Sequence, residues 1–284
     1  MITRFAPSPT GPLHLGHAYS ALYAFDLAQK NTGRFLVRIE DIDQSRSRPK
    51  WEEQIYEDLS WLGISWKTPV LRQSERLREY SDALKRLSIL GLTYQCSCNR
   101  RDIMQALTAP QEGADIPTGP DGLIYPGTCR DRHLEAKGIP ASLRLNMRKA
   151  IEAVQQPLSF NEHAHKKGHI DITAQHLINK VGDIVLARKD MGTSYHLSVV
   201  MDDAAQGVTD VVRGEDLFEA TAIHVLLQAL LGLPTPAYHH HKLIRDENGK
   251  RLAKRDDARA ISMYRTEGYS PADIRRMVNL PSDP

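Results

Sequence analysis

The chain has 284 residues, of which 41% are hydrophobic and 25% charged, and this is ordinary for a globular protein with one domain carrying an insertion or with two domains. The formal net charge of +2 neither requires nor excludes nucleic acid, because 37 basic residues can still gather on one face. No apolar run reaches the roughly 18 residues of a membrane span, and three cysteines in one region argue against a disulfide framework, so we expect a cytoplasmic protein without a membrane segment.

The first predicted elements are a strand over Ile2–Ala6 and a helix that starts at Leu15, separated by a stretch rich in Pro, Ser and Gly. Two histidines, His14 and His17, flank a Leu-Gly pair where this helix begins. A helix N-terminus offers unpaired N–H groups and a positive dipole end, which favour phosphate. Gly16 has no side chain to keep a ligand away from the backbone. This context indicates a nucleotide-binding loop rather than two surface histidines.

A second strand is predicted over 34–40, where apolar and charged residues alternate up to Glu40. Ligands bind at the carboxyl ends of strands in open parallel sheets, although the carboxylates here could also form a solvated acidic turn. Amphipathic helices are predicted over 51–62 and 74–90, the second with Ser74 as its N-cap. The order strand, helix, strand, helix, helix predicts a doubly wound parallel sheet.

The chain changes character near residue 94, and its only cysteines follow, namely Cys96, Cys98 and Cys129. A loop rich in Gly and Pro over 109–127 brings these thiols together, which favours a zinc site over core cysteines. A Cys-x-Cys pair alone is a weak signal, since free cysteines often only pack. The local candidates for a fourth ligand include Asp131 and His133.

Short strands are predicted between residues 141 and 173, with a charged hairpin tip over 163–168. An apolar strand is predicted over 184–188, and the segment 192–203 then brings the chain back to the fold of its first part. A helix over 217–231 follows, and Gly and Pro end it.

Arg213 lies near the end of a buried strand predicted over 208–216. A guanidinium in such a place is costly unless it faces a carboxylate. That carboxylate could belong to Glu215 or Asp216, or to an acidic substrate.

The chain resembles the class I aminoacyl-tRNA synthetases of the glutamyl and glutaminyl branch. Its opening Arg-Phe-Ala-Pro-Ser-Pro-Thr-Gly, followed by His-Leu-Gly-His, matches their first signature. Arg-Leu-Ala-Lys-Arg over 251–255, after a hairpin signal at 246–249, matches their second, with Arg251 and Ala253 as departures. The resemblance covers nearly the whole chain but only the catalytic half of a full enzyme, so no anticodon-binding domain is expected.

The resemblance implies an α/β fold with a doubly wound, Rossmann-like parallel sheet over 1–92 and 193–255. It places an inserted α+β subdomain, zinc-containing and of the acceptor-binding type, over 93–192. A short helical segment over 256–284 would end the chain.

The resemblance also implies site residues. ATP, accompanied by Mg²⁺, would be bound by His14, Gly16, His17, Arg251 and Lys254. Among these, charge on the phosphoryl oxygens would be stabilised by His14, His17 and Lys254. Glutamate would be selected by Arg4, Ser8, Glu40, Tyr195 and Arg213. In relatives without the anticodon domain a tyrosine oxygen completes the zinc site, which here implies Cys96, Cys98, Tyr125 and Cys129.

Those stand-alone relatives transfer glutamate to the queuosine base of tRNA(Asp), which implies L-glutamate, ATP and queuosine-containing tRNA(Asp) as partners of a monomer. Two other functions stay open: a truncated glutamyl-tRNA synthetase that charges the 3′ end, and a catalytically inactive zinc-containing RNA-binding module. A small-metabolite nucleotidylyltransferase shares the histidine loop but would lack the cysteine-rich insertion. Glutamate-dependent ATP–pyrophosphate exchange and dependence on queuosine distinguish these functions.

Overall fold

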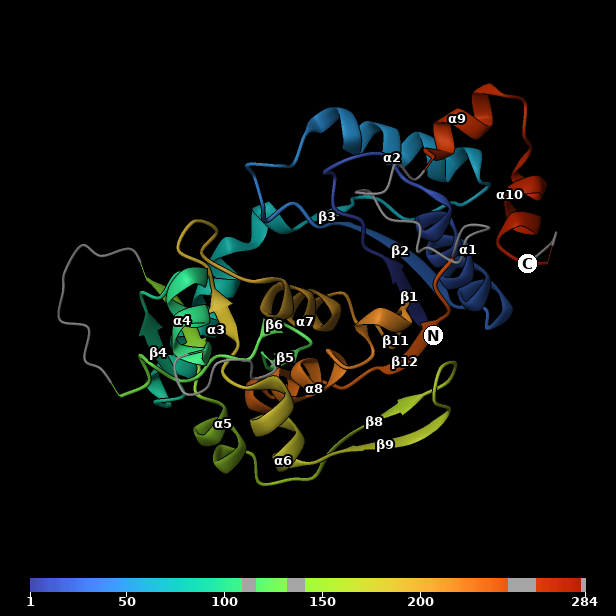
Figure 1. Cartoon of the computed structure of the whole chain (residues 1–284). Helices are drawn as coiled ribbons and strands as arrows, with labels where there is room; N and C mark the ends of the chain where they lie inside the picture. Colours follow the sequence, from blue (N-terminus) through green and yellow to red (C-terminus); the bar gives the residue numbers. More distant parts are fainter. Residues whose placement is uncertain (109–115, 132–140, 245–258, 282–284) are drawn as a thin grey trace.

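The structure, a computed structural model, describes residues 1–108, 116–131, 141–244 and 259–281 (Figure 1). Within these ranges no helix is both long enough and apolar enough to cross a membrane.

Strands and helices alternate through the first part of the chain. In order these elements are β1 (Ile2–Phe5), α1 (Leu15–Lys30), β2 (Arg34–Ile39), α2 (Pro49–Trp61), β3 (Leu71–Arg72), the 3₁₀ turn η1 (Gln73–Arg76) and α3 (Leu77–Ile89). The predicted strands at both ends of α1 and the start of α1 are confirmed. Strands β1, β2 and β3 are parallel, with Ile2 opposite Arg34 and Ile39 opposite Arg72.

The middle of the chain builds a separate antiparallel sheet. The elements of this part of the chain are β4 (Thr93–Cys96), α4 (Arg100–Thr108), β5 (Thr118–Gly119), β6 (Gly122–Leu123), β7 (Ser142–Leu145), α5 (Met147–Ala153), β8 (Leu158–Glu162), β9 (Gly168–Ile172), α6 (Ala174–His176), the π turn η2 (Leu177–Val181) and β10 (Val185–Ala187), of which β4, β7 and β10 form the sheet. Strand β7 lies between β10 and β4, and β5 pairs with β6 alone. The predicted hairpin tip over 163–168 is confirmed, because β8 and β9 are antiparallel partners.

The last part returns to parallel strands. Its elements are α7 (Tyr195–Ala205), β11 (Asp210–Gly214), η3 (Glu215–Leu217), α8 (Thr221–Leu231), β12 (Ala237–His241), α9 (Ile261–Thr266) and α10 (Pro271–Met277). Strands β11 and β12 are parallel, and β12 also pairs with β8, so this sheet has the order β11-β12-β8-β9. The α/β fold with parallel strands is confirmed, and β9 makes this sheet mixed. The domain boundaries within 93–192 stay a prediction.

Strand β11 lies beside β1, which brings the two parallel groups together. The backbone N–H of Thr209 donates to the carbonyl of Ile2 over 3.0 Å, and the N–H of Ile2 donates to the Thr209 hydroxyl over 2.8 Å. Helix α1 covers β1, because the Thr3 hydroxyl donates to the Ala24 carbonyl and the small alanines of α1 are buried. The carboxyl ends of β1, β2 and β11 therefore open toward one region.

Two helical details differ from the sequence prediction. Ser74 does not cap a helix: its N–H and hydroxyl both donate to the Asp41 carboxylate, and α3 begins only at Leu77. Helix α8 begins at Thr221, four residues after the predicted start at 217, since η3 and a turn over 218–220 take up the intervening residues. In both cases a polar side chain or a tighter turn competes with the α-helix.

Helices α9 and α10 lie beside α1 and α2, away from the α4 region (Figure 1). Two ionic hydrogen bonds of 2.8 Å fix this position, both from the Arg275 guanidinium to the buried Asp26 carboxylate of α1. The N–H of Ile261 also donates to the Leu13 carbonyl. The described chain that follows residue 258 therefore lies directly beside the histidine loop.

Candidate active site

The two histidines of the loop cap helix α1 together. His14 is the N-cap residue, and its Nδ1 accepts from the N–H of Gly16 over 3.1 Å. The Nδ1 of His17 accepts in turn from the N–H of His14 over 3.2 Å. This arrangement is a capping box with imidazoles in place of the usual hydroxyl and carboxylate.

The capping box fixes the tautomers of both rings. Because Nδ1 of His14 and of His17 each accepts an N–H, the proton of each neutral ring lies on Nε2. The ring centroids are 3.8 Å apart, so two donors of the same kind lie close together. Gly16 allows this packing, because a Cβ at this position would lie 3.0 Å from the His14 ring.

A cavity of about 360 Å³ opens beside these rings. Its lining includes residues from the ends of three strands and from the loop, among them Arg4, His14, Gly16, His17, Glu40, Tyr195 and Arg213. Seven of the residues predicted for ATP or glutamate thus meet in one cavity. Ser8 is exposed and lines a neighbouring cavity of about 1110 Å³, which shares His17, Glu40 and Tyr195 with the smaller one. Arg251 and Lys254 lie outside the described residues.

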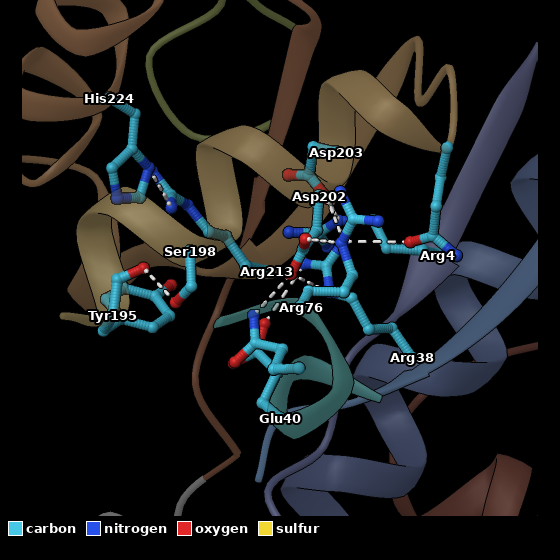
Figure 2. Close-up of polar contacts among 12 residues, drawn as sticks. Arg4, Arg38, Glu40, Arg76, Tyr195, Ser198, Asp202, Asp203, Arg213 and His224 are labelled. Carbon is cyan, nitrogen blue, oxygen red and sulfur yellow. Dashed lines mark hydrogen bonds and ion pairs between the residues drawn. The ribbon is translucent and has the colours of Figure 1, made fainter. Parts of the chain in front are cut away.

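Buried arginines and carboxylates form a charge cluster under this cavity (Figure 2). Asp203 of α7 accepts from Arg4 Nε over 2.9 Å and from Arg38 Nη1 over 2.6 Å. Arg38, which has no exposed surface, also donates to Glu40 over 3.1 Å. Burial opposes ionisation of Asp203, yet Arg4 and Arg38 hold the pKa of its carboxyl below its usual value.

The neighbouring Asp202 anchors α7 to the segment after β3. Its buried carboxylate accepts from Arg76 Nε over 2.8 Å, from the Tyr80 hydroxyl over 2.7 Å and from Gln73 over 2.9 Å. A carboxylate with this many donors is satisfied without a ligand. Asp202 therefore supports the floor of the site rather than its chemistry.

Arg213 has a different environment from Arg4 and Arg38. Its Nε donates to His240 over 3.0 Å, its Nη1 to His224 over 2.9 Å, and its Nη2 to the Thr221 hydroxyl over 2.8 Å and the Leu217 carbonyl over 3.3 Å. All four acceptors are uncharged, and among the described residues no carboxylate pairs with this guanidinium. Glu215 and Asp216, the partners that the sequence left open, do not bind it. A buried cation without a counter-ion favours an anionic ligand.

Burial shifts the pKa of two other wall residues. It raises the pKa of Glu40 above its usual value, although Arg38 and Arg4 act in the opposite direction. It also raises the pKa of the Tyr195 phenol, which is neutral near pH 7 already at its usual pKa. The wall thus presents the Glu40 carboxyl and the neutral Tyr195 hydroxyl. A substrate ammonium beside Glu40 would favour the ionised form of its carboxyl.

The three cysteine thiols lie in a second cluster, within 4.8 Å of one another. The Tyr125 hydroxyl oxygen lies 3.3 Å from Cys96 Sγ and 3.4 Å from Cys98 Sγ, and it accepts from the N–H of Cys129 over 2.9 Å. Burial raises the pKa of the Tyr125 phenol, so a phenolate there would need a cation beside it. The donor set of three thiols and one phenol fits zinc, and the described residues add no further His, Cys, Asp or Glu ligand to it.

Several buried residues of the site were not predicted from the sequence. Arg38 was expected on the polar side of its strand, and His224, His240 and Glu162 were not singled out. For two of them a signal was available: His224 is a polar residue inside the apolar helix α8, and His240 lies in a strand with three consecutive histidines. Arg38 has no such signal, because its partner Asp203 is 165 residues away.

The sequence matches a family described as tRNA synthetases class I (E and Q), catalytic domain, over residues 1–281. A Rhodobacter capsulatus protein named glutamyl-Q tRNA(Asp) synthetase is 62% identical, over 99% of this chain and 100% of that protein. A Nocardia farcinica protein of the same name is 42% identical, over 95% of this chain and 81% of that protein.

Solved structures of aminoacyl-tRNA synthetases are also similar to this chain. A glutamate tRNA ligase from Elizabethkingia meningosepticum, in complex with its amino acid, has a TM-score of 0.75 and 28% identity over 98% of this chain. Methionyl-tRNA synthetase from Mycobacterium tuberculosis, at 12% identity and a TM-score of 0.60, shares the fold alone. This chain spans 60% of the first of these proteins and 63% of the second.

Proposed function

The chain belongs to the class I tRNA synthetases of the E and Q catalytic-domain family, which are ligases, and from this premise we propose that it activates L-glutamate with ATP and transfers it to tRNA. We further propose that the acceptor is the queuosine base in the anticodon of tRNA(Asp). The name of a relative that is 62% identical over 99% of this chain supports this acceptor. The reaction would take place in the cytoplasm, where ATP and tRNA are both present.

The observation that carries glutamate as substrate is the charge of Arg213 in the cavity wall, which no carboxylate of the described residues contacts directly. The α-carboxylate of glutamate attacks the α-phosphorus of ATP, forming glutamyl-adenylate and releasing pyrophosphate. The side-chain carboxylate is therefore the group left to meet Arg213, with Arg4 beside it. Glu40 would hold the substrate ammonium, and Tyr195 would complete the wall.

Phosphoryl transfer of this kind needs positioning and charge stabilisation rather than a side-chain nucleophile. The Nε2 protons of His14 and His17 suit phosphoryl oxygens at the N-terminus of α1. Arg251 and Lys254 would add positive charge, with Mg²⁺ accompanying ATP. The described chain on either side of 245–258 supports this role, since Ile244 lines the cavity and Ala260 pairs with His14.

In the second step a hydroxyl of the tRNA would attack the carbonyl carbon of the adenylate and release AMP. The larger cavity, which adjoins the glutamate pocket, offers room for a nucleotide. Exposed basic side chains line it, namely Arg46, Arg100, Arg188 and Lys189. Such charges suit a phosphate backbone. Zinc bound by Cys96, Cys98, Cys129 and Tyr125 would stabilise the segment that carries part of this lining.

The test incubates the chain with labelled glutamate, ATP and total tRNA, prepared with or without queuosine, and maps the labelled nucleotide. We expect glutamate-dependent ATP–pyrophosphate exchange without tRNA, and a label on the queuosine base of tRNA(Asp) alone. Charging of the 3′ end of unmodified tRNA(Glu) would identify a truncated glutamyl-tRNA synthetase instead. Absence of exchange with glutamate would contradict the enzymatic proposal and favour an RNA-binding module.

A further inference from the structure

The hydrogen bonds of Arg213 continue beyond its first partners, from α8 across α7 to the β5–β6 turn. Arg213 Nη1 donates to His224 Nδ1 over 2.9 Å. His224 Nε2 lies 3.1 Å from His196 Nδ1, and His196 Nε2 lies 3.2 Å from Asp121 Oδ1. His196 and His224 are both buried, whereas Asp121 is exposed on the turn.

A guanidinium can only donate, and this fixes the direction of every bond in the row. Because Nδ1 of His224 accepts from Arg213, its proton lies on Nε2 and is donated to Nδ1 of His196. The proton of His196 then lies on Nε2 and is donated to Asp121. Both imidazoles are neutral in this arrangement. Burial beside Arg213 lowers the pKa of the His224 ring, which is consistent with a neutral His224.

The turn that carries Asp121 is itself held in place. Its two central residues, Pro120 and Asp121, join Gly119 to Gly122, and Gly119 packs so closely that a Cβ would lie 2.2 Å from the Lys180 carbonyl. Proline fixes one backbone angle of the turn. Asp121 and His196 also line the larger cavity, so the row connects that cavity with the glutamate pocket.

We propose that Asp121, His196 and His224 are positioning residues for Arg213: the neutral imidazoles orient the guanidinium, while the only negative charge of the row lies two imidazoles away. A carboxylate in direct contact would orient Arg213 equally well but would cancel the charge that a substrate carboxylate needs. This inference rests on the proposed function, since it assigns Arg213 the side-chain carboxylate of glutamate.

The first test compares variants of the exposed residue. In glutamate-dependent pyrophosphate exchange, D121A should raise the KM for glutamate about fivefold, the effect of one lost hydrogen bond, with the KM for ATP unchanged. D121N should stay within about twofold of wild type, because its amide oxygen still accepts from His196. D82A, which removes an exposed carboxylate from α3, is the matched control. A wild-type KM in D121A, or equal defects in D121N and D121A, would overturn the proposal.

The buried members of the row give a second test. H196N keeps the acceptor for His224 but loses the donor to Asp121, so it should match D121A, and the double variant should be no worse than either single one. H224N keeps an acceptor for Arg213 and should be milder than H224L, with thermal unfolding measured for each. Additive effects in the double variant would contradict a common row.

A third readout does not depend on activity. Nitrogen-15 NMR of the histidine rings should show His196 and His224 protonated on Nε2. A proton on Nδ1 of His224 would refute the row even in an active protein. If wild type shows no glutamate-dependent exchange while both tautomers agree, the row stands and the proposed function fails.

Discussion

Arg213 shows how one residue can be buried, fully charged and still available to a ligand. Four of its five N–H groups donate to neutral acceptors, which leaves one for a ligand within the described structure. A lysine in its place would have a compact ammonium with three donors and could not satisfy the same planar set of acceptors. We therefore expect this position to tolerate no other cation.

The prediction for this residue concerns the R213K variant. We expect the KM for glutamate to rise by a factor of about 100 or more, because both the planar fork and the orientation by the imidazoles are lost. The kinetics of pyrophosphate exchange measure this KM, and thermal unfolding confirms that the variant folds. R34K, at the exposed start of β2, is the control. A KM like that of wild type in R213K would show that glutamate does not meet this guanidinium.

The sequence pattern alone could predict that Arg213 matters but not how it is held. Its partners follow 11 and 27 residues later, and Glu162 precedes His240 by 78 residues. These contacts depend on the packing of α8 and on the pairing of β11, β12 and β8, which no local period encodes. The placement of His14 and His17 at the start of α1 could be predicted, because the signal for it lies within one turn of that helix.

At the scale of elements, α1 combines a structural cap with the proposed phosphate site in the same two rings. The strand, loop and helix at the start of the chain were predictable because each has a local signature: a short apolar run, Pro and Gly, and then helical spacing. The start of α3 was not predictable in this way, because Ser74 is engaged by Asp41, which lies 33 residues earlier. A cap signal fails where a distant carboxylate competes for the same donor.

Variants of His14 separate the two roles of the capping box. H14N keeps an oxygen that can accept from Gly16, so its free energy of unfolding should match wild type, whereas H14A should lose about 1 kcal/mol. Both should slow adenylate formation by a factor of about 100 or more, since neither has the Nε2 proton. Urea unfolding and pyrophosphate exchange measure the two effects. Wild-type exchange in H14N would remove His14 from phosphate binding.

The cysteine cluster joins β4 to the segment after β6 and gives a metal-dependent prediction. We expect one zinc ion per chain in wild type, and faster loss of zinc to a chelator in Y125F, because one of four ligands is removed. Metal content and the rate of transfer to a chromogenic chelator measure this. Y94F is the matched control, since Tyr94 donates to Asp183 outside the cluster. Equal rates in Y125F and Y94F would exclude Tyr125 as a ligand.

At the scale of the whole molecule, buried neutral histidines make stability depend on pH. Burial, together with the nearby Arg213, lowers the pKa of His240 to about 4 from its usual 6.5. Between these values the unfolded chain binds a proton that the folded chain does not, so the free energy of unfolding falls as the pH drops from 6.5 to 4. This single group accounts for a loss of about 3 kcal/mol.

The H240Q variant tests this dependence. Its amide oxygen can still accept from Arg213, but the side chain does not titrate, so the free energy of unfolding should fall less steeply between pH 6.5 and 4. Urea unfolding at several pH values measures the slope. H169Q, on the exposed β8–β9 hairpin, should keep the slope of wild type. An unchanged slope in H240Q would mean that His240 is not a buried neutral ring.

The central claim is that one cavity joins a phosphate site at the N-terminus of α1 to a carboxylate site at Arg213. The most direct measurement is a crystal structure with a non-hydrolysable sulfamoyl analogue of glutamyl-adenylate. The account predicts that its side-chain carboxylate hydrogen-bonds to Arg213, and that its sulfamoyl group contacts the rings of His14 and His17. An analogue bound with its carboxylate away from Arg213, or outside this cavity, would contradict the account.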